Sequence, residues 1–185
     1  MTGSKAHFFV VLVLIPIPMT SEGQHLQFLR LALDEAKKCT PTPTAFCVGC
    51  VIVSCLEAEP VVISAGYSRE LPGNTHAEAN ALSKFRSLSW DQLSKFNASA
   101  QSHADILASA DVYTTMEPCS IRTSGLSPCA EALIDARVKR CFIGVGEPDD
   151  FVHCEGAQKL VDAGIDVIWL KGLEEESLNV ARRGH

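Results

Sequence analysis

The sequence has no excess of positive charge. Among its 185 residues, 16 lysines and arginines stand against 22 aspartates and glutamates, which gives a formal net charge of -6. Affinity for nucleic acid depends on a basic surface that neutralises phosphates, so this balance disfavours a nucleic-acid-binding protein. A small-molecule substrate is the expected alternative.

The sequence also lacks internal repeats and an apolar stretch long enough to cross a membrane. An apolar segment runs from Phe8 to Met19, whereas a membrane-spanning helix needs about 20 apolar residues. No small-residue cleavage site follows it, as a secretory signal would require. We therefore expect residues 1–20 to form a docked apolar arm, for example at a subunit interface, rather than a targeting signal. Residues 21–185 are expected to form one domain, with no membrane partner.

Eight cysteines could form a disulfide framework, but several of them lie in runs that predict buried strands. The clearest run is Cys47-Val48-Gly49-Cys50-Val51-Ile52-Val53. Its Cys-x-x-Cys spacing also fits a metal or redox site, yet no second pair lies nearby, which favours core packing. We expect reduced cysteines, and therefore an intracellular, cytoplasmic protein.

Alternating apolar and β-branched segments predict helices interleaved with strands. Helices are expected over 22–38, from His76 onward, over 128–137, over 155–163 and over 173–182. The third of these has Ser127 as its expected N-cap and Pro128 in its first turn. Strands are expected over 48–54, 60–65, 111–115, 140–145 and 166–170. Residues 87–109 form a polar insertion with no assigned role. This order implies an α/β sheet covered by helices on both faces.

Four residues at the predicted ends of elements carry the chemistry: His76 and Glu78 at one helix start, Cys119 after a strand, and Cys129 at another helix start. A catalytic zinc ion takes three protein ligands and keeps a fourth position for water. One imidazole and two thiolates supply such a set. Glu78, close to the metal but not a ligand, can then move protons as general base and acid.

Simpler interpretations exist for each of these residues taken alone. A single His-x-Glu or Pro-Cys pair occurs often by chance, and a purely structural zinc site would use the same cysteines. Glu78 argues for catalysis, because a structural site does not need an acid-base group. The other histidines considered, His25, His103 and His153, lie in no motif and are expected at the surface or in loops.

The string His76-Ala77-Glu78, with Thr115-Met116-Glu117-Pro118-Cys119-Ser120 and Ser127-Pro128-Cys129, resembles the cytidine-deaminase superfamily. Nine residues separate the two cysteines, and a long spacer of this kind resembles the riboflavin-biosynthesis pyrimidine deaminases. Further similarity lies at Gly66-Tyr67 and at Gly146-Glu147-Pro148. The ending Gly172-Leu173-Glu174-Glu175 is similar to the fungal form.

This resemblance implies a three-layer α/β/α sandwich around a mixed five-stranded sheet, a bound zinc ion (Zn2+) and a homodimer. It implies deamination of 2,5-diamino-6-(ribitylamino)pyrimidin-4-one 5'-phosphate to 5-amino-6-(ribitylamino)uracil 5'-phosphate and ammonia. The sequence does not rank the ribitylamino against the ribosylamino substrate. Substrate contacts are expected from Ser68, Arg69, Asn74, Ala77, Arg122, Thr123 and Ser124, the last three at the phosphate.

The sequence departs from the family in one loop. Where bacterial members carry Pro-Asn-Pro-Asn, this chain has Pro41-Thr42-Pro43-Thr44-Ala45-Phe46-Cys47, which lacks asparagine. Ordinary exposed polar residues remain an equal interpretation of residues 122–124. Two other functions stay open: a tRNA or nucleic-acid base deaminase, which the acidic balance and the long spacer disfavour, and a non-catalytic zinc-binding module.

Overall fold

The computed structural model describes residues 21–95, 97–122, 125–148 and 154–184. The predicted arm over residues 1–20 lies outside the described residues. Its predicted role at a subunit interface therefore stays a prediction. Within them, no helix is both long enough and apolar enough to cross a membrane. All eight cysteines of the chain are free thiols.

The chain alternates helices and strands, as its sequence pattern predicts. The elements are α1 (Ser21–Lys37), β1 (Gly49–Ser54), β2 (Val61–Tyr67), α2 (Ala77–Ser87), α3 (Trp90–Leu93), α4 (His103–Ala108), β3 (Asp111–Met116), α5 (Cys129–Ala136), β4 (Arg140–Val145), α6 (Gly156–Asp162), β5 (Asp166–Trp169) and α7 (Glu174–Ala181). The predicted strands match the five observed strands to within a few residues.

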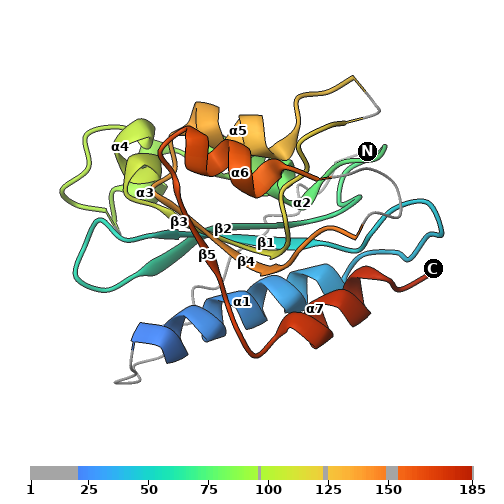
Figure 1. Cartoon of the computed structure of the whole chain (residues 1–185). Coiled ribbons are helices and arrows are strands. Elements are labelled where there is room, and N and C mark those ends of the chain that lie inside the picture. The colour runs from blue at the N-terminus through green and yellow to red at the C-terminus, as the bar shows by residue number, and fades with distance from the viewer. Residues whose placement is uncertain (1–20, 96, 123–124, 149–153, 185) are drawn as a thin grey trace, which may run out of the picture.

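The five strands form one mixed sheet in the order β2-β1-β3-β4-β5. β1 pairs antiparallel with β2 and with β3, whereas β3, β4 and β5 are parallel. Helices α1 and α7 cover one face, and α2 to α6 cover the other (Figure 1). The predicted three-layer α/β/α sandwich with a mixed five-stranded sheet is therefore confirmed.

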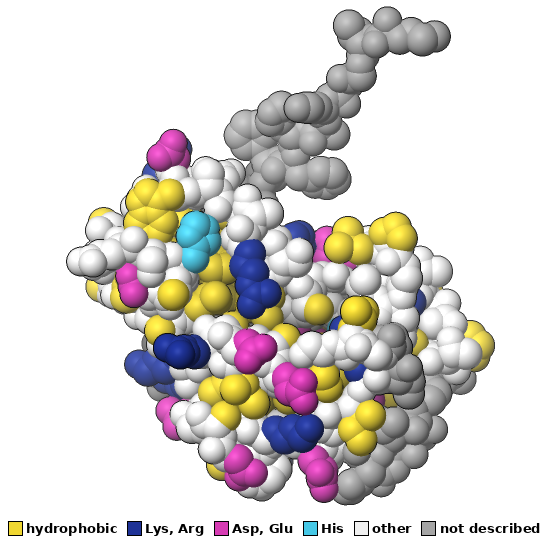
Figure 2. All heavy atoms as spheres, turned by 90° about the horizontal axis from the view of Figure 1, so that it is seen from above, with side chains coloured by type: hydrophobic (Ala, Val, Ile, Leu, Met, Phe, Trp, Pro, Cys, Tyr) yellow, Lys and Arg dark blue, Asp and Glu magenta, His cyan; other side chains and the backbone are white. Residues whose placement is uncertain are grey.

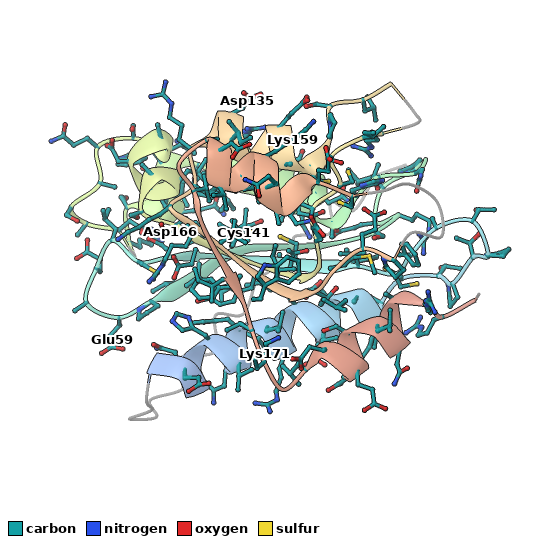
Figure 3. All side chains as sticks on the ribbon, viewed as in Figure 1. Glu59, Asp135, Cys141, Lys159, Asp166 and Lys171 are labelled. Carbon is teal, nitrogen blue, oxygen red and sulfur yellow. The ribbon has the colours of Figure 1, made fainter. Side chains whose placement is uncertain are left out.

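Two apolar layers, one on each face of the sheet, hold this sandwich together. The layer under α2, α4, α5 and α6 includes Phe85, Leu133 and Leu160, and the layer under α1 and α7 includes Leu33 and Phe142. Every residue of β1 is buried, because that strand lies in the sheet interior between two neighbours. In Figure 3, Cys141 lies in the sheet between the layers, whereas Asp135 and Lys159 lie on the outer helices.

The polar insertion over 87–109 contains two helices that the sequence pattern did not predict. It contains α3 and α4, and its side chains Leu93, Ile106 and Leu107 join the core. The local signal is weak because each helix is short and contributes only a few apolar residues. Local caps and packing in the core stabilise them together: Ser89 and Gln92 form a capping box at α3, and the Ser102 side chain accepts a hydrogen bond from the N–H of Asp105 at α4.

The prediction that His25 lies at the surface or in a loop was wrong. His25 is in α1, its ring stacks on Phe142 with centroids 4.3 Å apart, and its Nδ1 lies 2.7 Å from the hydroxyl of Tyr113. Burial is the first cause that lowers its pKa. His103 begins α4 and its Nε2 lies 3.0 Å from the carbonyl of Leu88. His153 lies outside the described residues.

The start of α5 also differs from the prediction. Pro128, not Ser127, is the N-cap, and it forms no side-chain capping bond. The helix therefore begins one position later than Ser127 and Pro128 indicated, with Cys129 as its first residue. The backbone N–H of Cys129 is then available to the neighbouring thiol of Cys119, which lies 3.3 Å away.

A close backbone contact sets the position of α2 on the sheet. A Cβ atom added to Gly66 of β2 would lie 2.5 Å from the carbonyl oxygen of Ala77 and 2.6 Å from the amide nitrogen of Ala81. Both neighbours are backbone atoms of α2, so they can yield only if the helix moves. Glycine at this position therefore lets the start of α2 approach the sheet.

We predict that Gly66→Ala destabilises the fold, because the added methyl group displaces the first turns of α2. The expected loss of unfolding free energy is about 1–3 kcal/mol, measured by urea denaturation. Gly146→Ala is the matched control, since the nearest atom to its added Cβ is 3.8 Å away. Equal stability of the two variants would contradict this account of the helix contact.

Candidate active site

Three potential metal ligands meet where two helices begin. His76 is the N-cap of α2, Cys119 follows β3, and Cys129 is the first residue of α5. The Nδ1 atom of His76 lies 3.5 Å from the Sγ of Cys119 and 3.4 Å from the Sγ of Cys129. The three ligand atoms all lie within 4.8 Å of one another.

These separations fit a tetrahedral zinc site. With Zn–N and Zn–S bonds of about 2.05 and 2.3 Å, a nitrogen and a sulfur ligand lie about 3.6 Å apart. Among the described residues, this is the one group of His, Cys, Asp or Glu side chains close enough to hold a metal ion. Cys47 and Cys50, the other pair with ligand spacing, are buried core residues.

The environment of the two thiols favours a thiolate. Hydrogen bonding to Cys129 is the first cause that lowers the pKa of Cys119 to about 4, and His76 acts in the same direction. The same pairing with Cys119 raises the pKa of Cys129. Both cysteines lie near helix N-termini, whose partial positive charge stabilises anions. A metal ion would therefore bind Cys119 as a thiolate and would displace the proton of the Cys129 thiol.

Glu78 lies beside this group without belonging to it. It is the second residue of α2, only 3% exposed, and its Oε1 lies 3.0 Å from the hydroxyl of Thr114. Burial raises the pKa of its carboxyl, and the nearby Cys119 adds to the effect. A buried carboxyl with a raised pKa next to a metal position has the properties of a general base and acid.

A pocket opens beside the three ligands, at the end of β3. Its lining residues come from several loops and strand ends and are Thr44, Ala45, Phe46, Val48, Ser68, Arg69, Asn74, His76, Glu78, Met116, Glu117, Cys119, Ile121, Arg122 and Glu147. Of the predicted substrate contacts, Ser68, Arg69, Asn74 and Arg122 are therefore present. Ala77 is fully buried and is not among the lining residues, and Thr123 and Ser124 lie outside the described residues.

Arg122 has an unused donor in the pocket wall. Its Nη2 donates to the carbonyl of Asn74 at 2.8 Å, and its Nη1 donates weakly to that of Ser127 at 3.4 Å. Its Nε is buried and has no hydrogen-bond partner within the described part of the chain. A buried guanidinium N–H without an acceptor is costly, and a bound anion would supply that acceptor.

Glu147 is a pocket residue that the sequence reasoning did not select. Its Oε2 is buried without a hydrogen-bond partner among the described residues, and burial is the first cause that raises its pKa to about 7. A signal was present: Glu147 lies two residues beyond the end of β4, the parallel neighbour of β3, and parallel strands end at the same edge of a sheet.

The comparisons with known proteins agree with this site. The model of the cytidine and deoxycytidylate deaminase zinc-binding region matches residues 22–145. A Schizosaccharomyces pombe diaminohydroxyphosphoribosylamino-pyrimidine deaminase is 42% identical over 161 residues, which cover 87% of this chain and 36% of the relative. The riboflavin biosynthesis protein RibD of Actinobacillus pleuropneumoniae is 31% identical over 167 residues, with coverage of 87% and 37%. The chain thus spans little more than a third of the length of these curated relatives.

Solved structures share the fold over nearly the whole described chain. The crystal structure of an Aspergillus oryzae Rib2 deaminase, a C-terminal deletion mutant at pH 4.6, aligns with a TM-score of 0.72 and 39% identity, covering 87% of this chain and 92% of that one. The same deaminase has been solved in complex with DARIPP, at a TM-score of 0.69, 34% identity and coverage of 87% and 91%. These matches confirm the predicted resemblance, and the chain belongs to the cytidine and deoxycytidylate deaminase zinc-binding family.

Proposed function

We propose that this protein is a zinc-dependent hydrolase of riboflavin biosynthesis. Its reaction would convert 2,5-diamino-6-(ribitylamino)pyrimidin-4-one 5'-phosphate and water to 5-amino-6-(ribitylamino)uracil 5'-phosphate and ammonia. The observation that carries the proposal is the set of Nδ1 and Sγ atoms of His76, Cys119 and Cys129 at tetrahedral separations, with the Glu78 carboxyl buried beside them. The relatives named for riboflavin biosynthesis and the DARIPP complex support the choice of substrate.

The proposed mechanism divides the work between the metal ligands and Glu78. A zinc ion on His76, Cys119 and Cys129 would supply a nucleophilic hydroxide from water at neutral pH. Glu78 would accept the proton that this water loses. It would give that proton to a ring nitrogen. It would then take a second proton, from the new hydroxyl group on the ring carbon, and pass it to the departing amino group, so that ammonia leaves and the carbonyl forms. Burial of Glu78 keeps competing water away from the transferred proton.

The pocket walls would orient the substrate. We propose that Ser68, Asn74 and the backbone of Ala77 face the pyrimidine, since Ala77 begins a helix and the first N–H groups of a helix have no acceptor within it. Arg122, with Thr123 and Ser124, would bind the phosphate, because its Nε lacks an acceptor. Glu147 would accept hydrogen bonds from N–H or O–H groups of the substrate. Arg69 lines the same pocket.

We also propose a cytoplasmic location and a homodimeric assembly for this domain. The free thiols favour the cytoplasm, residues 21–185 would act as one deaminase domain, and a homodimer remains the proposed assembly. Acidic and basic side chains are interspersed over the described residues of the face in Figure 2, which supports a small-molecule substrate rather than nucleic acid.

We predict that Glu78→Gln abolishes turnover while zinc stays bound, because the amide keeps the shape of the side chain but cannot carry a proton. Ammonia release from the ribitylamino substrate should fall by at least about 100-fold. Glu175→Gln, at the equivalent second position of α7 and exposed, is the matched control. The ribosylamino substrate, cytidine and tRNA are assayed in parallel as alternative substrates. Ammonia release by Glu78→Gln at the wild-type rate would refute the mechanism.

We predict that Cys129→Ser loses the metal. The wild-type protein should contain about one zinc per chain, and the variant should retain little of it, because a serine hydroxyl is a poor ligand in place of a thiolate. Metal analysis of dialysed protein measures this. Cys55→Ser is the control, since Cys55 is half-buried beside Asp111 and outside the ligand group. Loss of zinc from Cys55→Ser with retention in Cys129→Ser would place the metal elsewhere.

A further inference from the structure

Arg69 has an unusual backbone conformation at the edge of the pocket. It follows the end of β2 with φ at 61°, and among the described residues only one other non-glycine, Arg137, has a positive φ. Its backbone N–H donates to the carbonyl of Thr75 at 2.6 Å, directly before His76. Residues other than glycine rarely adopt this backbone conformation, so other interactions of Arg69 must stabilise it.

The guanidinium of Arg69 supplies those interactions. Its Nε donates to the carbonyl of Thr40 at 3.3 Å. Its Nη2 donates to the same carbonyl at 3.0 Å and to the Sγ of Cys47 at 3.3 Å. Its Nη1 donates to the carbonyls of Phe46 at 3.0 Å and Ala45 at 3.5 Å. A guanidinium has five N–H groups, so every donor of Arg69 has an acceptor within the protein.

All of these acceptors belong to one loop, residues 40–47, which connects α1 to β1. Three of its side chains, Thr44, Ala45 and Phe46, line the pocket, as do Ser68, Arg69 and Asn74 of the adjacent segment that leads to His76. This is the loop in which the chain departs from the bacterial pattern. It lies on the same side of the molecule as the end of α7 (Figure 1), where the N–H of Cys47 donates to the carbonyl of Ala181 at 2.9 Å.

We propose that Arg69 is a positioning residue that holds the 40–47 loop against the segment before His76 and thereby fixes the position of the pocket wall that these two segments form. It contacts the loop through its five donors and does not need to contact the substrate. A lysine cannot replace it, because an ammonium group has three donors and no planar fork. The substrate part of this inference rests on the proposed function, whereas the contact with the loop does not.

The charge of Arg69 requires a separate control. Within the described residues no Asp or Glu forms an ion pair with it, so its positive charge remains beside a pocket proposed to take a phosphate. Loss of the charge alone would weaken binding of an anion. Arg69→Lys keeps the charge and removes the fork, and therefore separates the two effects.

The test compares Arg69→Lys with Arg137→Lys, an exposed arginine of the same backbone conformation at the end of α5. In Arg69→Lys, amide hydrogen exchange of residues 40–47 should become at least about 10-fold faster, with zinc retained. For the proposed substrate, KM should rise about 10-fold while kcat changes less than about threefold. Arg137→Lys should match the wild-type protein in every measurement.

Two results would overturn the inference: unchanged exchange of the loop in Arg69→Lys, or a wild-type KM despite faster exchange. If Arg69→Lys does not fold, Arg69→Asn replaces it, because asparagine tolerates a positive φ and is too short to reach the loop. Absence of turnover in the wild-type protein would count against the proposed function alone. The exchange measurement would then decide the inference by itself.

Discussion

The N-termini of α2 and α5 converge beside the end of β3, and this junction determines the chemistry of the molecule. It brings an N-cap histidine and a first-turn cysteine, 53 positions apart in sequence, to 3.4 Å. Cys119 joins them from the segment after the strand. The start of α5 also directs the backbone N–H of Cys129 at the thiol of Cys119, which favours the anionic form of that thiol. The same start of α2 places Glu78 beside the ligands.

The mixed sheet determines which segments of the chain form the walls of the pocket. The parallel strands β3 and β4 end at one edge, so the residues that follow them, Cys119 and Glu147, face the same space. The antiparallel strands supply the remaining walls. The loop that enters β1 and the segment that leaves β2 lie side by side, because these two strands are paired. Arg69 connects these two walls. The close contact at Gly66 allows α2 to lie near enough to complete the site.

The sequence was sufficient for the five strands, for the helices outside residues 87–109 and for the grouping of His76, Cys119 and Cys129, because these follow from local patterns: periodicity, caps and short motifs at element ends. The sequence did not predict the side-chain partners of Arg69 and His25, because these partners come from segments far away in the chain. Nothing near Arg69 indicates that its acceptors lie in residues 40–47, and nothing near His25 indicates Tyr113 and Phe142. Glu147 was within reach through the rule for parallel strands, but its burial was not. The one-residue error at the start of α5 arose because proline also serves as an N-cap there.

X-ray absorption at the zinc edge of the purified protein measures whether His76, Cys119 and Cys129 form an open zinc site. We predict two sulfur neighbours at about 2.3 Å, one imidazole nitrogen at about 2.0–2.1 Å and one further light atom from water, in a four-coordinate site. A spectrum with three or four sulfur neighbours, or with no imidazole, would contradict the account.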